Sequence, residues 1–192
     1  MKVTEILEHE HRVIQQVASS CGVCAEAMRS GTKVPTDVLE SIVDFFGKYG
    51  DHYHRQHEEI LLSMLREKGA PFGRGPIALI NYENHKRRAL VDQLSSAVRA
   101  HITCGGAAKG MLIETLGALA EFFRGHIWKE DLLLLPMAEK VLSEEDKNLL
   151  ADWLHFIESK NGAEAQKAVE GFNAALHHCM DAIAQPRKAQ AA

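Results

Sequence analysis

The chain has 192 residues, enough for one well-cored domain, and 26 acidic against 22 basic residues give it a net charge of −4. Acids and bases are interleaved, and the single short basic run at 86–88 is typical of a solvated helix face, so we expect no nucleic-acid partner. No apolar run approaches the roughly 18 residues that span a bilayer, and the N-terminus lacks a signal-peptide pattern. We therefore expect a cytoplasmic protein with no membrane partner and four reduced cysteines.

Apolar residues recur at helical spacing in four long segments separated by short breakers, which predicts helices over 3–29, 36–68, 76–103 and 109–141. Thr36 is expected to cap the second helix, and Pro136 to kink or end the fourth. A shorter helix follows, opened by the capping-box pattern at 143–146, and another covers 163–184. The tail 185–192 is predicted to be disordered.

These elements predict an all-α fold: an up-down-up-down four-helix bundle with two additional C-terminal helices packed on its side or end. We assign residues 1–142 to a metal-binding bundle, 143–184 to the accessory helices, and 185–192 to the tail. Neither an internal repeat nor the period-two pattern of a strand is evident.

The chain contains eleven histidines, and two of them belong to H-x-x-x-E motifs, His54 with Glu58 and His126 with Glu130. This spacing places an imidazole and a carboxylate one helical turn apart, so both can converge on one ion. One such pair arises easily by chance on a charged helix, whereas two pairs on alternate helices are a stronger signal. Imidazole and carboxylate together suit iron, manganese or zinc.

The helical faces support a shared site. Both motifs interrupt apolar stripes, and so does His11 on the first helix, whereas His9 and His52 lie well off their stripes. In antiparallel helices, side chains meet when they lie at similar sequence distances from the intervening turn. By this criterion His85 on the third helix joins the same layer as the other three histidines. Each histidine alone is better explained by packing or exposure, but burying the whole set without a cation would be costly.

The chain resembles the hemerythrin-like HHE cation-binding family over about residues 3 to 160. The resemblance is carried by Glu10-His11-Arg12-Val13-Ile14, His54-x-x-x-Glu58-Glu59, Asn84-His85 and His126-x-x-x-Glu130-Asp131 followed by Leu134-Leu135-Pro136. It implies that four histidines bind two irons, bridged by two glutamates: His11, His54, His85, His126, Glu58 and Glu130. The oxygen-carrying hemerythrins have a further histidine one turn beyond the third-helix ligand, where this chain has Ala89.

Ligand counting on this implied set suggests a function. Two histidines per ion, two shared carboxylates and a bridging oxo or hydroxo group give five ligands, so one place on each iron stays open for O2, H2O2 or NO. The leading interpretation is therefore a non-haem di-iron protein that binds or reacts with such a molecule in stress defence or sensing. The alternative is iron storage, or donation for metal-centre repair, without turnover. Mn or Zn are possible substitutes, and the redox partner is left open.

Other residues receive weaker interpretations. Cys21 and Cys24 form a C-x-x-C pattern within a helix, which favours packed, reduced thiols over a redox couple. Tyr82, Glu59 and Asp131 could each approach the site, with packing or solvent-facing roles as the alternatives. The remaining histidines of the C-terminal helices are expected at the surface: His155, His177 and His178.

Overall fold

The computed structural model describes the backbone of residues 3–189 and side chains as far as residue 179. In this range the chain forms helices joined by short turns, without a strand. The elements in chain order are α1 (Val3–Arg29), α2 (Thr36–Phe45), the π-helix η1 (Phe46–His54), α3 (Arg55–Glu67), α4 (Gly75–Cys104), the 3₁₀-helix η2 (Gly105–Ala108), α5 (Lys109–Lys129), the π-helix η3 (Glu130–Leu134), α6 (Leu135–Val141) and α7 (Glu144–Ala189).

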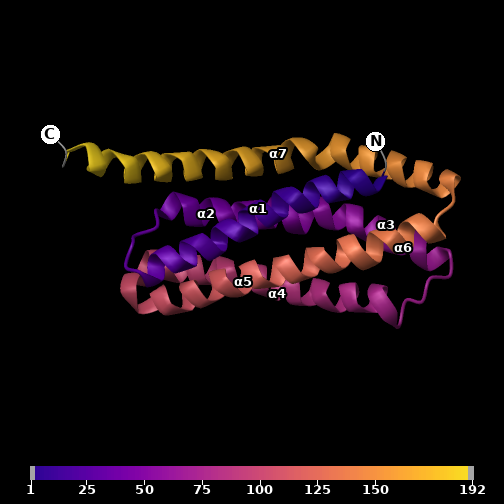
Figure 1. Cartoon of the computed structure of the whole chain (residues 1–192), viewed down its shortest axis with the longest axis horizontal. Coiled ribbons are helices and arrows are strands. Elements are labelled where there is room, and N and C mark those ends of the chain that lie inside the picture. The colour runs from indigo at the N-terminus through magenta and orange to yellow at the C-terminus, as the bar shows by residue number, and fades with distance from the viewer. Residues whose placement is uncertain (1–2, 190–192) are drawn as a thin grey trace.

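Four long rods form the bundle (Figure 1). The first rod is α1, the second is α2–η1–α3, the third is α4, and the fourth is α5–η3–α6. The first and fourth rods pack together, as do the third and fourth, and α2 also contacts α4. The chain reverses direction between successive rods, so the expected helical bundle is present. None of the described helices is long and apolar enough to cross a membrane.

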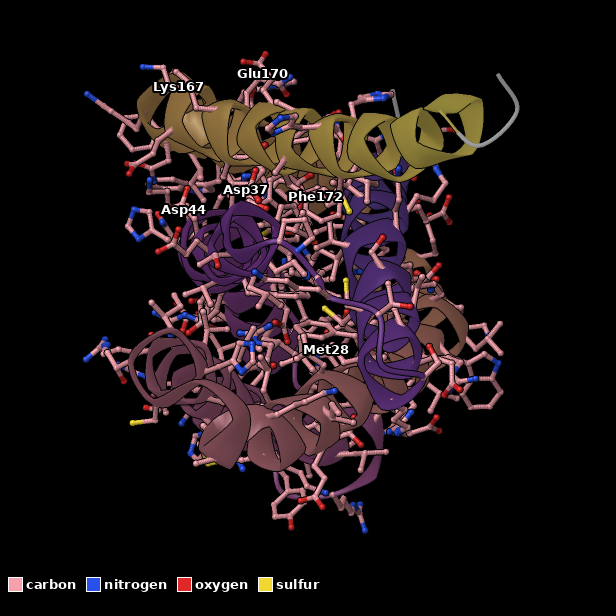
Figure 2. All side chains as sticks on the ribbon, turned by 90° about the vertical axis from the view of Figure 1, so that its left-hand side faces the viewer. Met28, Asp37, Asp44, Lys167, Glu170 and Phe172 are labelled. Atoms are coloured by element: carbon pink, nitrogen blue, oxygen red, sulfur yellow. The ribbon has the colours of Figure 1, made fainter. Side chains whose placement is uncertain are left out.

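The C-terminal part departs from expectation. One continuous helix, α7, replaces the two shorter helices and extends to Ala189. It packs along α2, η1 and α3, and Figure 2 shows it as a separate layer whose Phe172 points toward the bundle. The predicted interruption near Gly162 is absent because this buried glycine lies against the bundle, which stabilises the helix through the weak position. Of the predicted tail, 185–189 is helical and 190–192 lies outside the described residues.

At the N-termini of α7 and α2, backbone amides donate hydrogen bonds to side chains close to them in sequence. Ser143 and Asp146 form the reciprocal capping box at α7: the Ser143 amide donates to Asp146 Oδ2 (3.0 Å), and the Asp146 amide donates to Ser143 Oγ (3.2 Å). At α2 the expected cap by Thr36 is wrong. Pro35 occupies the N-cap without a side-chain hydrogen bond, and the Val38 amide donates instead to Asp37 Oδ1 at 3.0 Å.

The apolar core is divided into two clusters along the bundle axis. One contains Phe46, Leu119 and Phe123, and the other contains Leu61 and Leu134. Between them lies a layer of buried polar side chains contributed by all four rods: Glu10, His11, His54, His57, Glu58, Arg87, His126 and Glu130. A polar layer that interrupts a packed core on every helix marks the position of a functional site.

Candidate metal centre

Five of the six predicted ligands meet in the polar layer. Each of two buried groups offers three ligand atoms within 4.8 Å of one another, and Glu130 belongs to both. The first group adds His11 and His54, and the second adds Glu58 and His126. Two cations held by these groups would lie next to each other and share one carboxylate.

The imidazoles converge on the Glu130 carboxylate. His11 Nε2 lies 3.0 Å from Glu130 Oε2, and His126 Nε2 lies 3.1 Å from Glu130 Oε1. His54 Nε2 lies 4.0 Å from Oε2. Each of these histidines therefore presents its Nε2 edge to the interior of the cluster, where a metal ion would bind.

On the side of each ring that faces away from the cluster, a carboxylate contacts the Nδ1 atom of the histidine. Asp131 Oδ1 lies 2.5 Å from His11 Nδ1, and Glu10 Oε2 lies 2.8 Å from His54 Nδ1. Behind His126, Glu83 Oε2 lies 3.0 Å from Nδ1. A carboxylate that accepts the Nδ1 proton fixes the tautomer in which Nε2 carries a lone pair, and it also makes that nitrogen more basic. All three imidazoles are thus prepared as metal ligands.

Both π-helices lie at ligand positions. In an α-helix each step of four residues turns the side chain about 40° further round the axis. His54 is the last residue of η1, and Glu130 is the first residue of η3. Because a π-helix has more residues per turn, these segments offset the 40° rotation, so that residues four apart stay on the same face. Beyond η3 the buried stripe therefore continues at Leu134, whereas Leu133 is 38% exposed.

The electrostatics of the layer suit a bound cation. Burial, together with the charge of Glu130, raises the pKa of Glu58 above its ordinary value. Burial would also raise the pKa of Glu130, but His126 and His11 outweigh burial and hold it well below the ordinary range. Burial lowers the pKa of His11, yet the acids Asp131 and Glu130 dominate and raise it to about 10. The carboxylates of Glu58 and Glu130 are buried close together, so their negative charges repel each other unless a cation lies between them.

The residues present fit a metal ion. Both oxygens of Glu130 and the Nε2 atom of His126 are buried and have no hydrogen-bond partner among the described residues. Leaving buried polar atoms unpaired is expensive, so such atoms require another partner. A cation coordinated by the two groups would satisfy all three atoms at once, and its donor set of imidazole and carboxylate is one that iron, manganese and zinc accept.

The sixth predicted ligand does not reach the cluster. His85 is exposed, and Tyr82, also considered for the site, is 68% exposed. The inward stripe of α4 is instead Ile77, Ile80, Asn84, Arg87, Val91 and Leu94. His85 follows Asn84 by one residue and so lies about 100° further round the helix, which is why it faces solvent.

Two other side chains of α4 point inward instead: Asn84, to which we assigned no role, and Arg87, which is 1% exposed and so does not lie on the solvated face that we expected for residues 86–88. Asn84 Nδ2 donates to Glu58 Oε1 at 2.6 Å, and Arg87 Nη1 donates to Glu58 Oε2 at 3.3 Å. The signal that could have found them is the apolar spacing of α4, because steps of three and four through Ile80, Val91 and Leu94 pass through these two positions.

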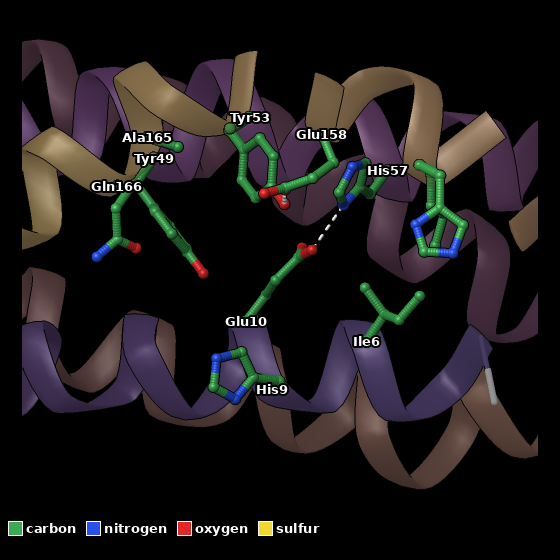
Figure 3. Close-up of a pocket in the computed structure, with 12 residues that line it drawn as sticks. Ile6, His9, Glu10, Tyr49, Tyr53, His57, Glu158, Ala165 and Gln166 are labelled. Atoms are coloured by element: carbon green, nitrogen blue, oxygen red, sulfur yellow. Dashed lines mark hydrogen bonds and ion pairs between the residues drawn. The ribbon is translucent and has the colours of Figure 1, made fainter. Parts of the chain in front are cut away.

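The sequence interpretation also missed Glu10 and His57. Glu10 holds His54 with one oxygen, and its other oxygen lies 2.6 Å from Nδ1 of the buried His57. Beside this pair is a cavity of about 240 Å³, which α7 helps to line (Figure 3). There Tyr53 of η1 donates a hydrogen bond to Glu158 of α7. The additional helix therefore closes over the face of the bundle that carries the acid behind His54.

The residues with weaker interpretations lie in different surroundings. Asp131 contacts His11 from behind, whereas Glu59 is exposed and pairs with Arg55 at 2.5 Å. Cys21 and Cys24 are buried free thiols, and burial raises the pKa of Cys24 to about 11. The histidines expected at the surface or off their stripes are exposed: His9, His52, His155, His177 and His178.

Comparison with known proteins agrees with this geometry. The family model described as hemerythrin HHE cation binding domain matches residues 2–138, which include the four rods as far as α6. No curated protein and no solved structure gives a significant match. The family match covers well over half of the chain and all of the clustered histidines and glutamates, and the chain therefore belongs to the hemerythrin HHE cation-binding domain family.

Proposed function

We propose that this protein is a hemerythrin-like non-haem iron protein that binds or reacts with O2, H2O2 or NO in stress defence or sensing. The observation that carries the proposal is the pair of buried ligand groups joined by Glu130. Two iron positions, one at each group, account for every unpaired atom of this carboxylate. Manganese or zinc would be accepted by the same donors.

Iron in such a centre would supply redox chemistry and an open place for a small ligand. The residues of the chain supply the setting. His11, His54 and His126 present Nε2 to the interior, their partner acids fix the rings, and the apolar clusters on both sides limit access of water. Among the described residues five candidate ligands converge, and this small number favours binding of an exogenous molecule over a closed structural site.

The test is spectroscopic. Metal-free protein is loaded anaerobically with Fe(II) and exposed separately to O2, H2O2 and NO while its absorption spectrum is followed. We expect at least one of them to produce a new ligand-to-metal band, and we expect the band to be absent from His126→Ala. The matched control is His9→Ala, which changes an exposed histidine and should behave as the wild type.

The competing function is iron storage or donation. A storage protein would yield its iron to a chelator rapidly and show no spectral response to any of the three molecules. That result would overturn the proposed reactivity while leaving metal binding intact.

A further inference from the structure

The two ligand groups are chemically unequal. The first combines two imidazoles, His11 and His54, with Glu130. The second has one imidazole, His126, and takes a second carboxylate, Glu58. An equal pair would require an imidazole from α4, and this helix directs Asn84 and Arg87 inward instead.

Arg87 already brings a cation to the second group. Its side chain is 1% exposed, with Nη1 3.3 Å from Glu58 Oε2 and Nε 3.3 Å from Asp51 Oδ1. A guanidinium stays charged at any pH that a folded protein tolerates. This fixed charge therefore neutralises part of the negative charge that would otherwise attract a second metal ion.

The two glutamates differ in how free they are to bind an ion. Both oxygens of Glu58 are engaged by α4, one by Asn84 at 2.6 Å and one by Arg87 at 3.3 Å. Both oxygens of Glu130 lack any hydrogen-bond partner within the described part of the chain. An ion at the first group meets a carboxylate with no competing donor, whereas an ion at the second shares Glu58 with Asn84 and Arg87 and comes close to a buried positive charge.

We propose that the centre binds its two ions in unequal steps, tightly at His11, His54 and Glu130 and more weakly at Glu58, His126 and Glu130, and that Arg87 sets the difference. This inference rests on the proposed function in that it takes the cluster to be the metal centre. It adds that the second ion is the exchangeable one. Changes in the groups that orient metal ligands alter affinity by about 10- to 100-fold, which is the size of difference we expect between the steps.

The experiment is an anaerobic titration of metal-free protein with Fe(II) in competition with a chromogenic chelator. We expect two steps whose affinities differ by about 10- to 100-fold, with one ion kept through gel filtration. Arg87→Met removes the charge while keeping an unbranched apolar stem, and it should tighten the second step by a similar factor. The first step should stay unchanged. Arg88→Met, an exposed neighbour on the same helix, is the matched control and should leave both steps as in the wild type.

Three further variants identify the steps and protect the test against misfolding. His54→Ala should abolish the tight step, and His126→Ala should abolish the weak one. Asn84→Ala releases one oxygen of Glu58 without touching the arginine, so it should also tighten the second step if Arg87→Met fails to fold, as judged by circular dichroism.

The proposal is overturned if the wild type binds two ions with equal affinity, or if folded Arg87→Met leaves the second step unchanged. These outcomes are distinct from failure of the proposed function. A protein that fills in two unequal steps but ignores O2, H2O2 and NO would keep this inference and lose that function.

Discussion

At the scale of single residues, the centre depends on the Glu130 carboxylate, whose buried oxygens face His11 and His126 at 3.0 and 3.1 Å and have no hydrogen-bond partner among the described residues. Glu130 is 1% exposed and its two oxygens belong to both ligand groups, whereas Glu58 belongs to one. Glu59 is adjacent in sequence to Glu58 but faces solvent beside Arg55. The three glutamates therefore occupy three different chemical situations and should respond differently to removal.

We predict that Glu130→Ala loses both ions, that Glu58→Ala loses the ion of the second group, and that Glu59→Ala keeps both. The reason is that only Glu130 offers a ligand atom to each group. A bound ion stabilises the folded protein by an amount that grows with the logarithm of the free-ion concentration over the dissociation constant, about 2.7 kcal/mol per site at a hundredfold excess. Elemental analysis after gel filtration, with thermal melts with and without Fe(II), measures both effects. Metal lost from Glu59→Ala and retained by Glu130→Ala would show that the shared ligand has been misidentified.

The sequence identified five of the residues that cluster in the polar layer because their helices carry clear apolar stripes that the polar residues interrupt. On α4 it was wrong, because His85 was placed in the layer by its sequence distance from the turns, which does not show the direction in which a side chain points; the spacing of Ile80, Val91 and Leu94 does. Glu10 and His57 were missed for another reason. Their role is to contact side chains on other rods, and periodicity along one helix does not show which rods are adjacent.

At the scale of elements, α7 shows how tertiary contact decides whether a helix continues. We expected a break before residue 163, whereas α7 continues through two interior glycines, Gly162 and Gly171, each of which weakens a helix by about 1 kcal/mol relative to alanine. The structure keeps one helix because its inner face packs on α2, η1 and α3. Local helix propensity predicted the ends of the bundle helices well, but it does not account for the contacts that α7 makes with other helices. It likewise gave no sign of the π-helices, whose wider turns depend on packing in the bundle.

The two glycines allow a matched test of α7. A Cβ added at Gly171 meets nothing within 4 Å, so Gly171→Ala should raise the free energy of unfolding by about 1 kcal/mol. A Cβ at Gly162 would lie 2.5 Å from Glu158 Oε1, which must then move away. The gain in helix propensity should be offset by loss of the hydrogen bond that Tyr53 donates to Glu158, so Gly162→Ala should stabilise less.

Urea denaturation of the two variants measures the difference. In a Glu158→Ala background the obstructing side chain is gone, and Gly162→Ala should then recover most of the gain seen at Gly171. Equal stabilisation by both substitutions in the wild-type background would show that Glu158 moves without cost and that its bond to Tyr53 adds little.

At the scale of the whole molecule, metal binding, protonation and stability are linked through the buried layer. The pKa of His11 is raised to about 10 from an ordinary value of 6.5. In metal-free protein the protonated ring therefore contributes stability that is fully present below about pH 6.5 and is lost as pH rises through about 10. A metal ion binds only the deprotonated ring, so it competes with this proton and gains affinity as pH rises.

We therefore predict that stabilisation by Fe(II), measured as the difference in free energy of unfolding with and without the ion, grows between pH 6 and pH 8. For each proton displaced, the affinity should rise about tenfold per pH unit, equivalent to about 1.4 kcal/mol. Because the pKa of His126 is also raised, chiefly by the charge of Glu130 against the opposing effect of burial, filling the second position should release a further proton. Anaerobic denaturation at a series of pH values gives the slope. Calorimetric titration in two buffers of different ionisation enthalpy counts the protons independently. A stabilisation that is constant over this range, or that falls as pH rises, would mean that the histidines are already deprotonated in the metal-free protein and that the surrounding acids do not hold the proton that the ion must displace.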